Sequence, residues 1–371
     1  MDFSISRDNI FKALQKVINV IPSKSTVEIL YNVFISAYEN KLSITATDLE
    51  ITQIAWTDCI VREAGEITVP GKLLLDIIRE LPNEEIQFTA DENNKVLIKS
   101  ALGEYKLSGE SKAEFPSIPV ISSELNATID NKYLKTMIEK TIFACSTDHF
   151  RPALTGVLCQ IMEKEYRMVA TDGHRLVKII NSDFSGNSNA RDLIIPTKAL
   201  NFVARNLPES GNQQITLSDN HVLFELPDTK IFSRIINEPY PDNERVIPAE
   251  FTKEVVIDRN QFISSIKRVS LFSNPITSQI KIQLSENNMN ISAQDIDFGG
   301  EANENVSCLY QNEDLEIAYN ANYLIDILRH LDCEKVKFTV NDSDGPALLF
   351  PDSIDEKDLN IVMLIMPVRI N

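Results

Sequence analysis

The chain has 371 residues, which is too long for one ordinary hydrophobic core and predicts two or three domains. No apolar run approaches the roughly 18 residues of a membrane span, and the N-terminus lacks signal-peptide features, so we expect a cytoplasmic protein. Five cysteines without a Cys-x-x-Cys pair and four scattered histidines argue against a disulfide framework and against thiolate or multi-histidine metal sites, and we expect no cofactor. The formal net charge of −18, taken alone, argues against a DNA partner.

Four short landmarks recur in the same order at nearly equal spacing. They are Ile5-Ser6-Arg7, Ala46-Thr47-Asp48, Val69-Pro70 and Phe115-Pro116, then Ile129-Asp130-Asn131, Ala170-Thr171-Asp172, Ile195-Pro196 and Tyr240-Pro241, then Ile257-Asp258-Arg259, Ala293-Gln294-Asp295, Tyr319-Asn320 and Met366-Pro367. One match can arise by chance, but four in order across three copies are hard to obtain that way. We therefore predict three tandem repeats, with domains at 1–122, 123–249 and 250–371.

Each repeat predicts the same elements in chain order. A strand is followed by a helix of 3.6-residue periodicity, as at Ile10, Leu14 and Val17, and then by alternating strands. A strand ending in Pro or Asn leads into a second helix, and two or three strands complete the repeat. We expect helices over 6–19, 71–81, 130–143, 197–207, 258–272 and 320–331, and about eight short strands per repeat. This is an α+β fold with two helices covering one face of antiparallel sheet.

Positive charge gathers on these six helical segments, which sum to +7 and leave −25 for the rest of the chain. The second helices align without gaps and place Arg79, Arg205 and Arg329 at one equivalent position. For any one helix, Lys and Arg are as easily explained as solvated side chains. Across six helices, a face that meets phosphate explains the segregation better, and such contacts give sequence-independent, salt-sensitive binding. No aromatic platform is interleaved with these residues, which argues against a single-strand binder.

Three strings carry a resemblance to a known family. They are Val-Ala-Thr-Asp-Gly-His-Arg-Leu at 169–176, Tyr240-Pro241-Asp242 with Arg-Val-Ile-Pro at 245–248, and Met-Pro-Val-Arg-Ile at 366–370. Together with three tandem repeats, they resemble the bacterial sliding clamps, the β subunits of DNA polymerase III. The resemblance implies the DNA clamp fold in a head-to-tail homodimer, a ring whose helices line a hole for duplex DNA. It implies a non-catalytic processivity factor at the nucleoid, loaded by an ATP-dependent clamp loader, that tethers the polymerase and repair proteins to DNA.

The basic residues expected to contact DNA come from the helices and from two loops that match basic loops of the family. They are Lys12, Lys16, Lys24, Lys72, Arg79, Lys132, Lys135, Arg151, Lys198, Arg205, Lys267, Arg268 and Arg329. For the ring contact, the similarity points to Tyr105 and Leu107 of the first repeat meeting Leu271 and Phe272 of the third. Around them, a basic end carries Lys72, Lys99 and Lys106, and an acidic end carries Asp295, Asp297, Glu301 and Glu304.

The resemblance also implies an apolar pocket between the second and third repeats that binds short linear peptides of partner proteins. Its residues would be Leu154, Thr171, Gly173, His174, Arg175, Leu176, Pro241, Arg245, Val246, Leu364, Ile365, Met366, Pro367, Val368 and Arg369. The alternative is that Leu176, Val246, Ile365 and Met366 are core residues. Two departures concern the pocket: Thr277 stands where an aromatic residue is expected, and Asn371 extends the usual apolar terminus.

Two other function classes compete with the clamp hypothesis. A hydrolase would use Asp172 and His174, which would share one face if they lay on a strand, or else Asp148 with His149. No Gly-x-Ser-x-Gly, phosphate loop or His-Glu-x-x-His completes such a site. A DNA-free scaffold built from repeats is the second alternative, and retention on circular DNA distinguishes it from a clamp.

Overall fold

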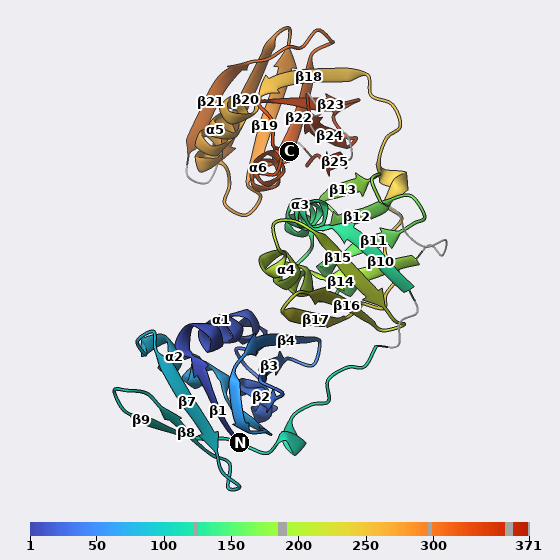
Figure 1. The fold of residues 1–371 in the computed structure, drawn as a ribbon. Coiled ribbons are helices and arrows are strands. Elements are labelled where there is room, and N and C mark those ends of the chain that lie inside the picture. Colours follow the sequence, from blue (N-terminus) through green and yellow to red (C-terminus); the bar gives the residue numbers. More distant parts are fainter. Residues whose placement is uncertain (122–124, 185–190, 296–298, 353–358, 370–371) are drawn as a thin grey trace. The chain divides into compact units, whose positions relative to one another are not determined.

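A computed structural model describes residues 1–121, 125–184, 191–295, 299–352 and 359–369 (Figure 1). The first repeat contains β1 (Asp2–Ser6), α1 (Arg7–Val17), β2 (Asn32–Tyr38), β3 (Lys41–Thr47), β4 (Ile51–Asp58), β5 (Ile60–Glu63), β6 (Gly65–Pro70), α2 (Gly71–Glu80), β7 (Glu85–Ala90), β8 (Lys95–Lys99) and β9 (Glu104–Ser108). The second contains β10 (Leu125–Asp130), α3 (Asn131–Thr141), β11 (Gly156–Ile161), β12 (Tyr166–Thr171), β13 (Arg175–Asn181), β14 (Arg191–Pro196), α4 (Thr197–Asn206), β15 (Asn212–Leu217), β16 (His221–Leu226) and β17 (Thr229–Arg234). The third contains β18 (Lys253–Asp258), α5 (Arg259–Val269), β19 (Gln279–Ser285), β20 (Asn288–Asp295), β21 (Gly300–Ser307), β22 (Leu315–Asn320), α6 (Ala321–Arg329), β23 (Lys335–Val340), β24 (Ala347–Pro351) and β25 (Leu359–Ile365).

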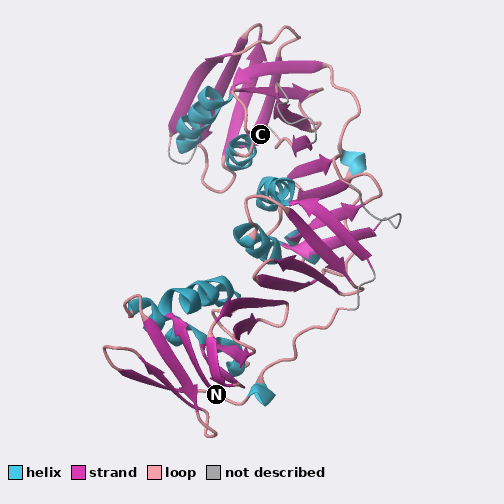
Figure 2. Cartoon of the chain, viewed as in Figure 1, coloured by secondary structure: helices cyan, strands magenta, loops and turns pink. Residues whose placement is uncertain are grey.

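The element order confirms the predicted repeat. All six helices fall inside the predicted segments. Three of the four landmarks lie at equivalent ends of strands or starts of helices, and the fourth, Phe115-Pro116 with its counterparts, follows the last strand of each repeat. In the first repeat α1 packs beside α2, and in the third α5 packs beside α6 (Figure 2). The side chains that gave the first helix its periodicity, Ile10, Leu14 and Val17, are fully buried. An apolar stripe at helical spacing therefore faces the sheets, as amphipathic helices require.

The chain forms two compact units whose limits cross the second repeat. One comprises Met1–Leu134 with Lys198–Ile235, and the other comprises Lys135–Thr197 with the residues from Ile236 on. In the first compact unit, an eight-stranded sheet runs in the order β10-β15-β16-β17-β4-β3-β2-β6, beside the five-stranded sheet β5-β1-β7-β8-β9. In the second, an eight-stranded sheet runs β14-β11-β12-β13-β25-β24-β23-β18, beside the four-stranded sheet β21-β20-β19-β22. Successive repeats are thus joined by backbone pairing of β17 with β4 and of β13 with β25.

The backbone groups at the helix ends find hydrogen-bond partners in the same way in the first and third repeats. Ser6 and Asp258 accept hydrogen bonds from the backbone N–H of Asn9 (3.2 Å) and Gln261 (2.8 Å), so each caps the first helix of its repeat. Arg7 donates from Nε to the carbonyl of Ile78 (2.9 Å), and Arg259 donates to that of Leu331. Both arginines therefore offset the partial negative charge at the C-terminal end of the second helix. Their charge joins the two helices of a repeat and is not available to bind phosphate.

In the described part of the chain, no helix is long and apolar enough to cross a membrane, and no cluster of His, Cys, Asp and Glu has the arrangement of a metal site. The five cysteines are free thiols. Burial raises the pKa of Cys145 and of Cys159 to about 12, so both remain protonated at neutral pH. These two thiols therefore behave as small core side chains.

Candidate functional site

The string Thr-Asp-Gly-His-Arg forms a hairpin turn between β12 and β13. Because β12 ends at Thr171 and β13 begins at Arg175, the expectation that Asp172 and His174 share a strand face is wrong. Gly173 has φ +94°, a left-handed conformation that favours glycine. Asp172 Oδ1 accepts hydrogen bonds from the backbone N–H of His174 (2.9 Å) and of Arg175 (3.0 Å). The carboxylate is thus committed to holding the turn and is a poor general base.

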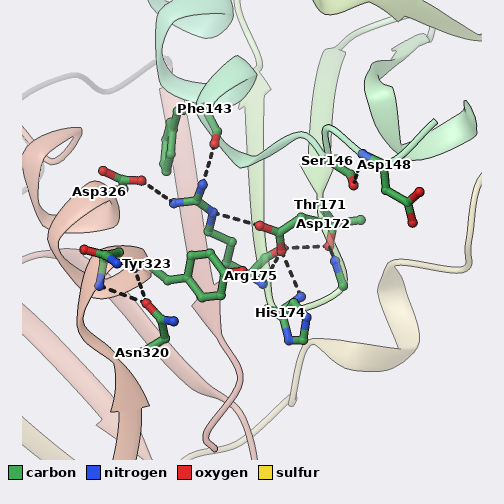
Figure 3. A network of polar contacts seen from close by, with 12 residues as sticks. Phe143, Ser146, Asp148, Thr171, Asp172, His174, Arg175, Asn320, Tyr323 and Asp326 are labelled. Atoms are coloured by element: carbon green, nitrogen blue, oxygen red, sulfur yellow. Dashed lines mark hydrogen bonds and ion pairs between the residues drawn. The ribbon is translucent and has the colours of Figure 1, made fainter. Parts of the chain in front are cut away.

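Arg175 lies at the centre of a polar network in the second compact unit (Figure 3). Its guanidinium donates to Asp172 Oδ2 (3.1 Å), Asp326 Oδ2 (2.8 Å) and the carbonyl of Phe143 (2.7 Å). The same group lies 5.2 Å from the ring centre of Phe143 and 4.8 Å from that of Tyr323. With its side chain 9% exposed, Arg175 is a buried cross-link between the hairpin turn and α6. It does not offer a free charge at the surface.

Four residues of this network were missed in the sequence: Phe143, Tyr323, Asp326 and His330. The His330 ring stacks on Phe143 with centres 3.8 Å apart and planes 6° apart, and its Nδ1 lies 2.7 Å from the carbonyl of Asp326. Tyr323 also stacks against His174, at 5.7 Å. Three of the four come from α6 and its C-terminal end, far along the chain from the turn. No local signal marks them, because they meet only where α6 packs against the 3-10 turn Ile142–Ala144 and the hairpin turn.

An apolar cluster in the eight-stranded sheet brings part of the predicted pocket together. Leu176 on β13 lies directly opposite Leu364 on β25, and the backbone N–H of Met366 donates to the carbonyl of His174 (2.8 Å). The cluster consists of Leu158, Val169, Leu176, Ile194, Leu348 and Leu364, with Ala153, Ile236, Tyr240, Ile247, Phe251, Phe350, Val362 and Met366 packed against it. These side chains form a continuous apolar layer at the joint between two repeats.

Burial divides the predicted pocket residues into two groups. Leu154, Arg175, Leu176, Leu364 and Ile365 are buried, so the core alternative holds for Leu176 and Ile365. Val246 is 44% exposed and Met366 is half-buried, so neither is a core residue. Also at the surface, wholly or in part, are Thr171, Gly173, His174, Pro241, Arg245, Pro367, Val368 and Arg369. Accessible apolar and polar side chains therefore lie beside a buried apolar layer at this joint.

The loop that departs from the family pattern lies beside this surface. The Thr277 side chain is exposed, and its carbonyl accepts a hydrogen bond from Asn320 Nδ2 (2.9 Å) at the start of α6. Gln279 Nε2 donates to the carbonyl of Arg369 (3.4 Å), which joins the loop to the C-terminal segment. The other departure, Asn371, lies outside the described residues, as does Ile370.

The basic residues predicted to contact DNA lie at the surface, and all except the half-buried Lys16 are exposed. Several are paired with carboxylates of the chain itself. These pairs are Lys16–Asp228 (2.5 Å), Arg79–Asp76 (2.9 Å), Arg151–Asp148 (2.9 Å), Lys198–Asp48 (2.5 Å), Arg268–Glu304 (2.7 Å) and Arg329–Asp326 (3.9 Å). Hydrogen bonding to Arg268 holds the pKa of Glu304 below its usual value. Such pairing weakens the attraction of these cations for phosphate.

The residues predicted for the ring contact lie at sheet edges and on an exposed turn. Tyr105 and Leu107 are on β9, the edge strand of the five-stranded sheet. Leu271 is 81% exposed and Phe272 is 44% exposed, just after α5 and near β21, the edge strand of the four-stranded sheet. Of the surrounding charges, Lys99 pairs with Glu104 (3.1 Å) and Glu304 pairs with Arg268, while Asp297 lies outside the described residues. Leu107 is buried in the single chain (7% exposed) and Tyr105 is half-buried, so the exposed apolar side chains among these four residues are those of Leu271 and Phe272. An exposed apolar turn beside an unpaired strand edge is typical of association surfaces.

Comparison with known proteins identifies the class to which this three-repeat fold belongs. Models of the DNA polymerase III beta subunit match over 1–119 for its N-terminal domain, 128–242 for its central domain and 244–369 for its C-terminal domain. The beta sliding clamps of Pseudomonas aeruginosa and Chlamydia muridarum are 32% and 30% identical, with 100% of each chain covered. The crystal structure of the P. aeruginosa sliding clamp matches with a TM-score of 0.92 at 32% identity, again over 100% of both chains. A Bartonella birtlesii DnaN sliding clamp bound to griselimycin matches with a TM-score of 0.94 at 31% identity and 100% coverage of both chains.

The fold is therefore that of a DNA clamp, an accessory protein without catalytic activity. The chain belongs to the bacterial DNA polymerase III beta subunits, the sliding clamps that act as processivity factors of that polymerase. The predicted fold class, function and lack of enzymatic activity are confirmed, and the hydrolase and DNA-free scaffold alternatives are wrong. The domain limits and the individual site residues stay predictions.

Proposed function

We propose that two copies of the chain close head to tail into a ring around duplex DNA, at the nucleoid in the cytoplasm. The observation that carries this proposal is the repeated position of Arg79, Arg205 and Arg329, all exposed in the last turn of the second helix of their repeats. The apolar residues Leu271 and Phe272 of one copy would meet Tyr105 and Leu107 of the other. A heterologous contact that closes after two copies gives a ring with no free ends.

Two measurements test the ring. Native mass spectrometry should find a dimer near twice 41.9 kDa. With a clamp loader and ATP, the protein should stay on nicked circular DNA and leave once that DNA is linearised, because topological linkage needs no tight contact. Equal loss from both DNA forms, or a stable monomer or trimer, would show that the ring of two chains is wrong.

Arg205 and Arg79 should contribute unequally to DNA binding. Both are exposed at the equivalent position, but Arg79 pairs with Asp76, whereas Arg205 has no ion pair within the described parts of the chain. We expect Arg205→Ala to lower the slope of log affinity against log salt concentration by about 1, and Arg79→Ala to lower it less. Salt titrations with a duplex oligonucleotide measure this difference, and equal slopes would place Arg205 away from phosphate.

We further propose that the polymerase III catalytic subunit, the clamp loader and repair proteins bind the surface at the β13–β25 joint through short peptides. We call this surface the peptide pocket; its accessible residues include His174, Pro241, Arg245, Val246 and Met366. Accessible apolar side chains beside polar ones suit a short amphipathic segment. Methionine adapts to differing side chains, which suits a surface that receives several partners.

A further inference from the structure

The segment that connects the second and third repeats packs along the apolar cluster. Tyr240, Ile247 and Phe251 of this segment contact the cluster, and the Tyr240 hydroxyl donates to the carbonyl of Val169 (3.3 Å). Between Tyr240 and Ile247, the segment forms one short 3-10 turn, Glu244–Val246. The segment is thus attached by apolar contacts on both sides of a polar turn.

A buried lysine reaches that turn from the sheet. Lys178 on β13 lies opposite Val169 on one side and Val362 on the other, and both valines contribute to the apolar layer. The Lys178 side chain is 10% exposed, and its Nζ lies 2.5 Å from Glu244 Oε1. Arg167 on β12 places Nη1 3.6 Å from the same oxygen. Two cations of the sheet therefore face one carboxylate of the connecting segment, and Arg167 also makes a closer pair with Glu165.

The two ends of this ion pair differ in exposure, because the Lys178 side chain is buried whereas that of Glu244 is 57% exposed. An ammonium group among apolar side chains is costly unless a counter-charge stays beside it. Glu244 is the only carboxylate that pairs with Lys178 within the described parts of the chain. Arg245 and Val246, the next residues of the same turn, are 85% (side chain) and 44% exposed and belong to the peptide pocket. Fixing Glu244 thus fixes where Val246 stands.

We propose that Lys178 and Arg167 are positioning residues that act through Glu244 to set the pocket wall formed by Val246. This inference rests on the proposed peptide pocket and adds residues that do not contact the peptide. Breaking the pair from either side should weaken ligand binding because the turn shifts. If the ion pair contributed only to stability, breaking it would lower the melting temperature and leave the affinity for the ligand unchanged.

The variants Glu244→Gln and Lys178→Met should each weaken binding about tenfold, which equals about 1.4 kcal/mol. Glu244→Gln leaves Lys178 without its counter-charge, and Lys178→Met leaves Glu244 with only the more distant Arg167 (3.6 Å). The double variant Lys178→Met/Glu244→Leu removes both charges and should lose less than the sum of the singles. Lys178→Arg keeps the charge and should restore most of the affinity. The matched control Lys337→Met breaks the Lys337–Glu254 pair (3.2 Å) of the same sheet, away from the turn, and should bind as the unaltered protein does.

Griselimycin, the ligand of the Bartonella structure, serves as the probe, with affinity measured by calorimetry and melting temperature measured in parallel. The expected result is weaker binding in the Lys178 and Glu244 variants, coupling in the double variant, and no change in the control. Unchanged affinity in both single variants would overturn the proposal. A Val246→Glu variant tests the pocket separately from the ion pair. If this variant binds griselimycin as the unaltered protein does, the pocket is misplaced and the inference fails with it.

Discussion

Replacing Arg175 by methionine should lower the free energy of unfolding by about 3 kcal/mol, because it leaves buried polar groups without their partner. The change would remove the donor to Asp172, to Asp326 and to the carbonyl of Phe143 at once. Methionine fills similar space, so the loss reports mainly on the charge and its hydrogen bonds. For a unit of this size, the melting temperature should fall by roughly 10 °C, as measured by calorimetry.

Arg245→Met is the matched control for this experiment. Arg245 also pairs with an aspartate, Asp242 at 2.8 Å, but its side chain is 85% exposed. Solvent screens such a pair, so the melting temperature should change by no more than about 1 °C. The melting temperature of Arg175→Lys should lie between those of Arg175→Met and Arg245→Met, because lysine keeps the charge but cannot donate to all three acceptors of the guanidinium. Equal melting temperatures for Arg175→Met and Arg245→Met would contradict the role of Arg175 as a buried cross-link.

Replacing Leu271 by aspartate should convert the proposed dimer to monomers. Leu271 is 81% exposed in the single chain, so the change should leave folding intact. In a closed ring, the side chain would be buried at both contacts, where losing an apolar residue and burying a charge cost about 3 kcal/mol or more per contact. That corresponds to a loss of more than about 100-fold in affinity. Sedimentation velocity across a dilution series measures the shift.

Leu309→Asp provides the comparison for Leu271→Asp. Leu309 is 62% exposed, lies in the same repeat, pairs through its backbone with Val256 and is not among the residues proposed for the contact. The Leu309→Asp variant should stay dimeric and should load on circular DNA as the unaltered protein does. If both variants dissociate alike, the loss reflects added charge rather than the contact. If neither dissociates, Leu271 does not lie at the ring contact.

The sequence alone determined the repeat, the helices and the face on which the cations lie. These features are local, because residues three and four apart share a helix face and a capping side chain lies within one turn of what it caps. The burial of Ile10, Leu14 and Val17 follows from such a pattern. The equivalence of Arg79, Arg205 and Arg329 needed only an alignment of the chain with itself.

Only the tertiary structure decided which strands join the repeats and what happens to Arg175 and Lys178. The pairing of β17 with β4 and of β13 with β25 joins strands that are far apart in the chain, and no local sequence pattern shows which strands will meet. The alternation of side chains along β13 places Lys178 on the same face of the sheet as Leu176. It does not reveal that Glu244 of the connecting segment pairs with Lys178. In the sequence, Arg175 resembles a charged surface residue, and only the structure shows that Tyr323 and Asp326 of α6 contact it. Whether a charged side chain binds a partner or holds the fold depends on what distant segments bring to it, because burial decides how strongly a charge must be paired.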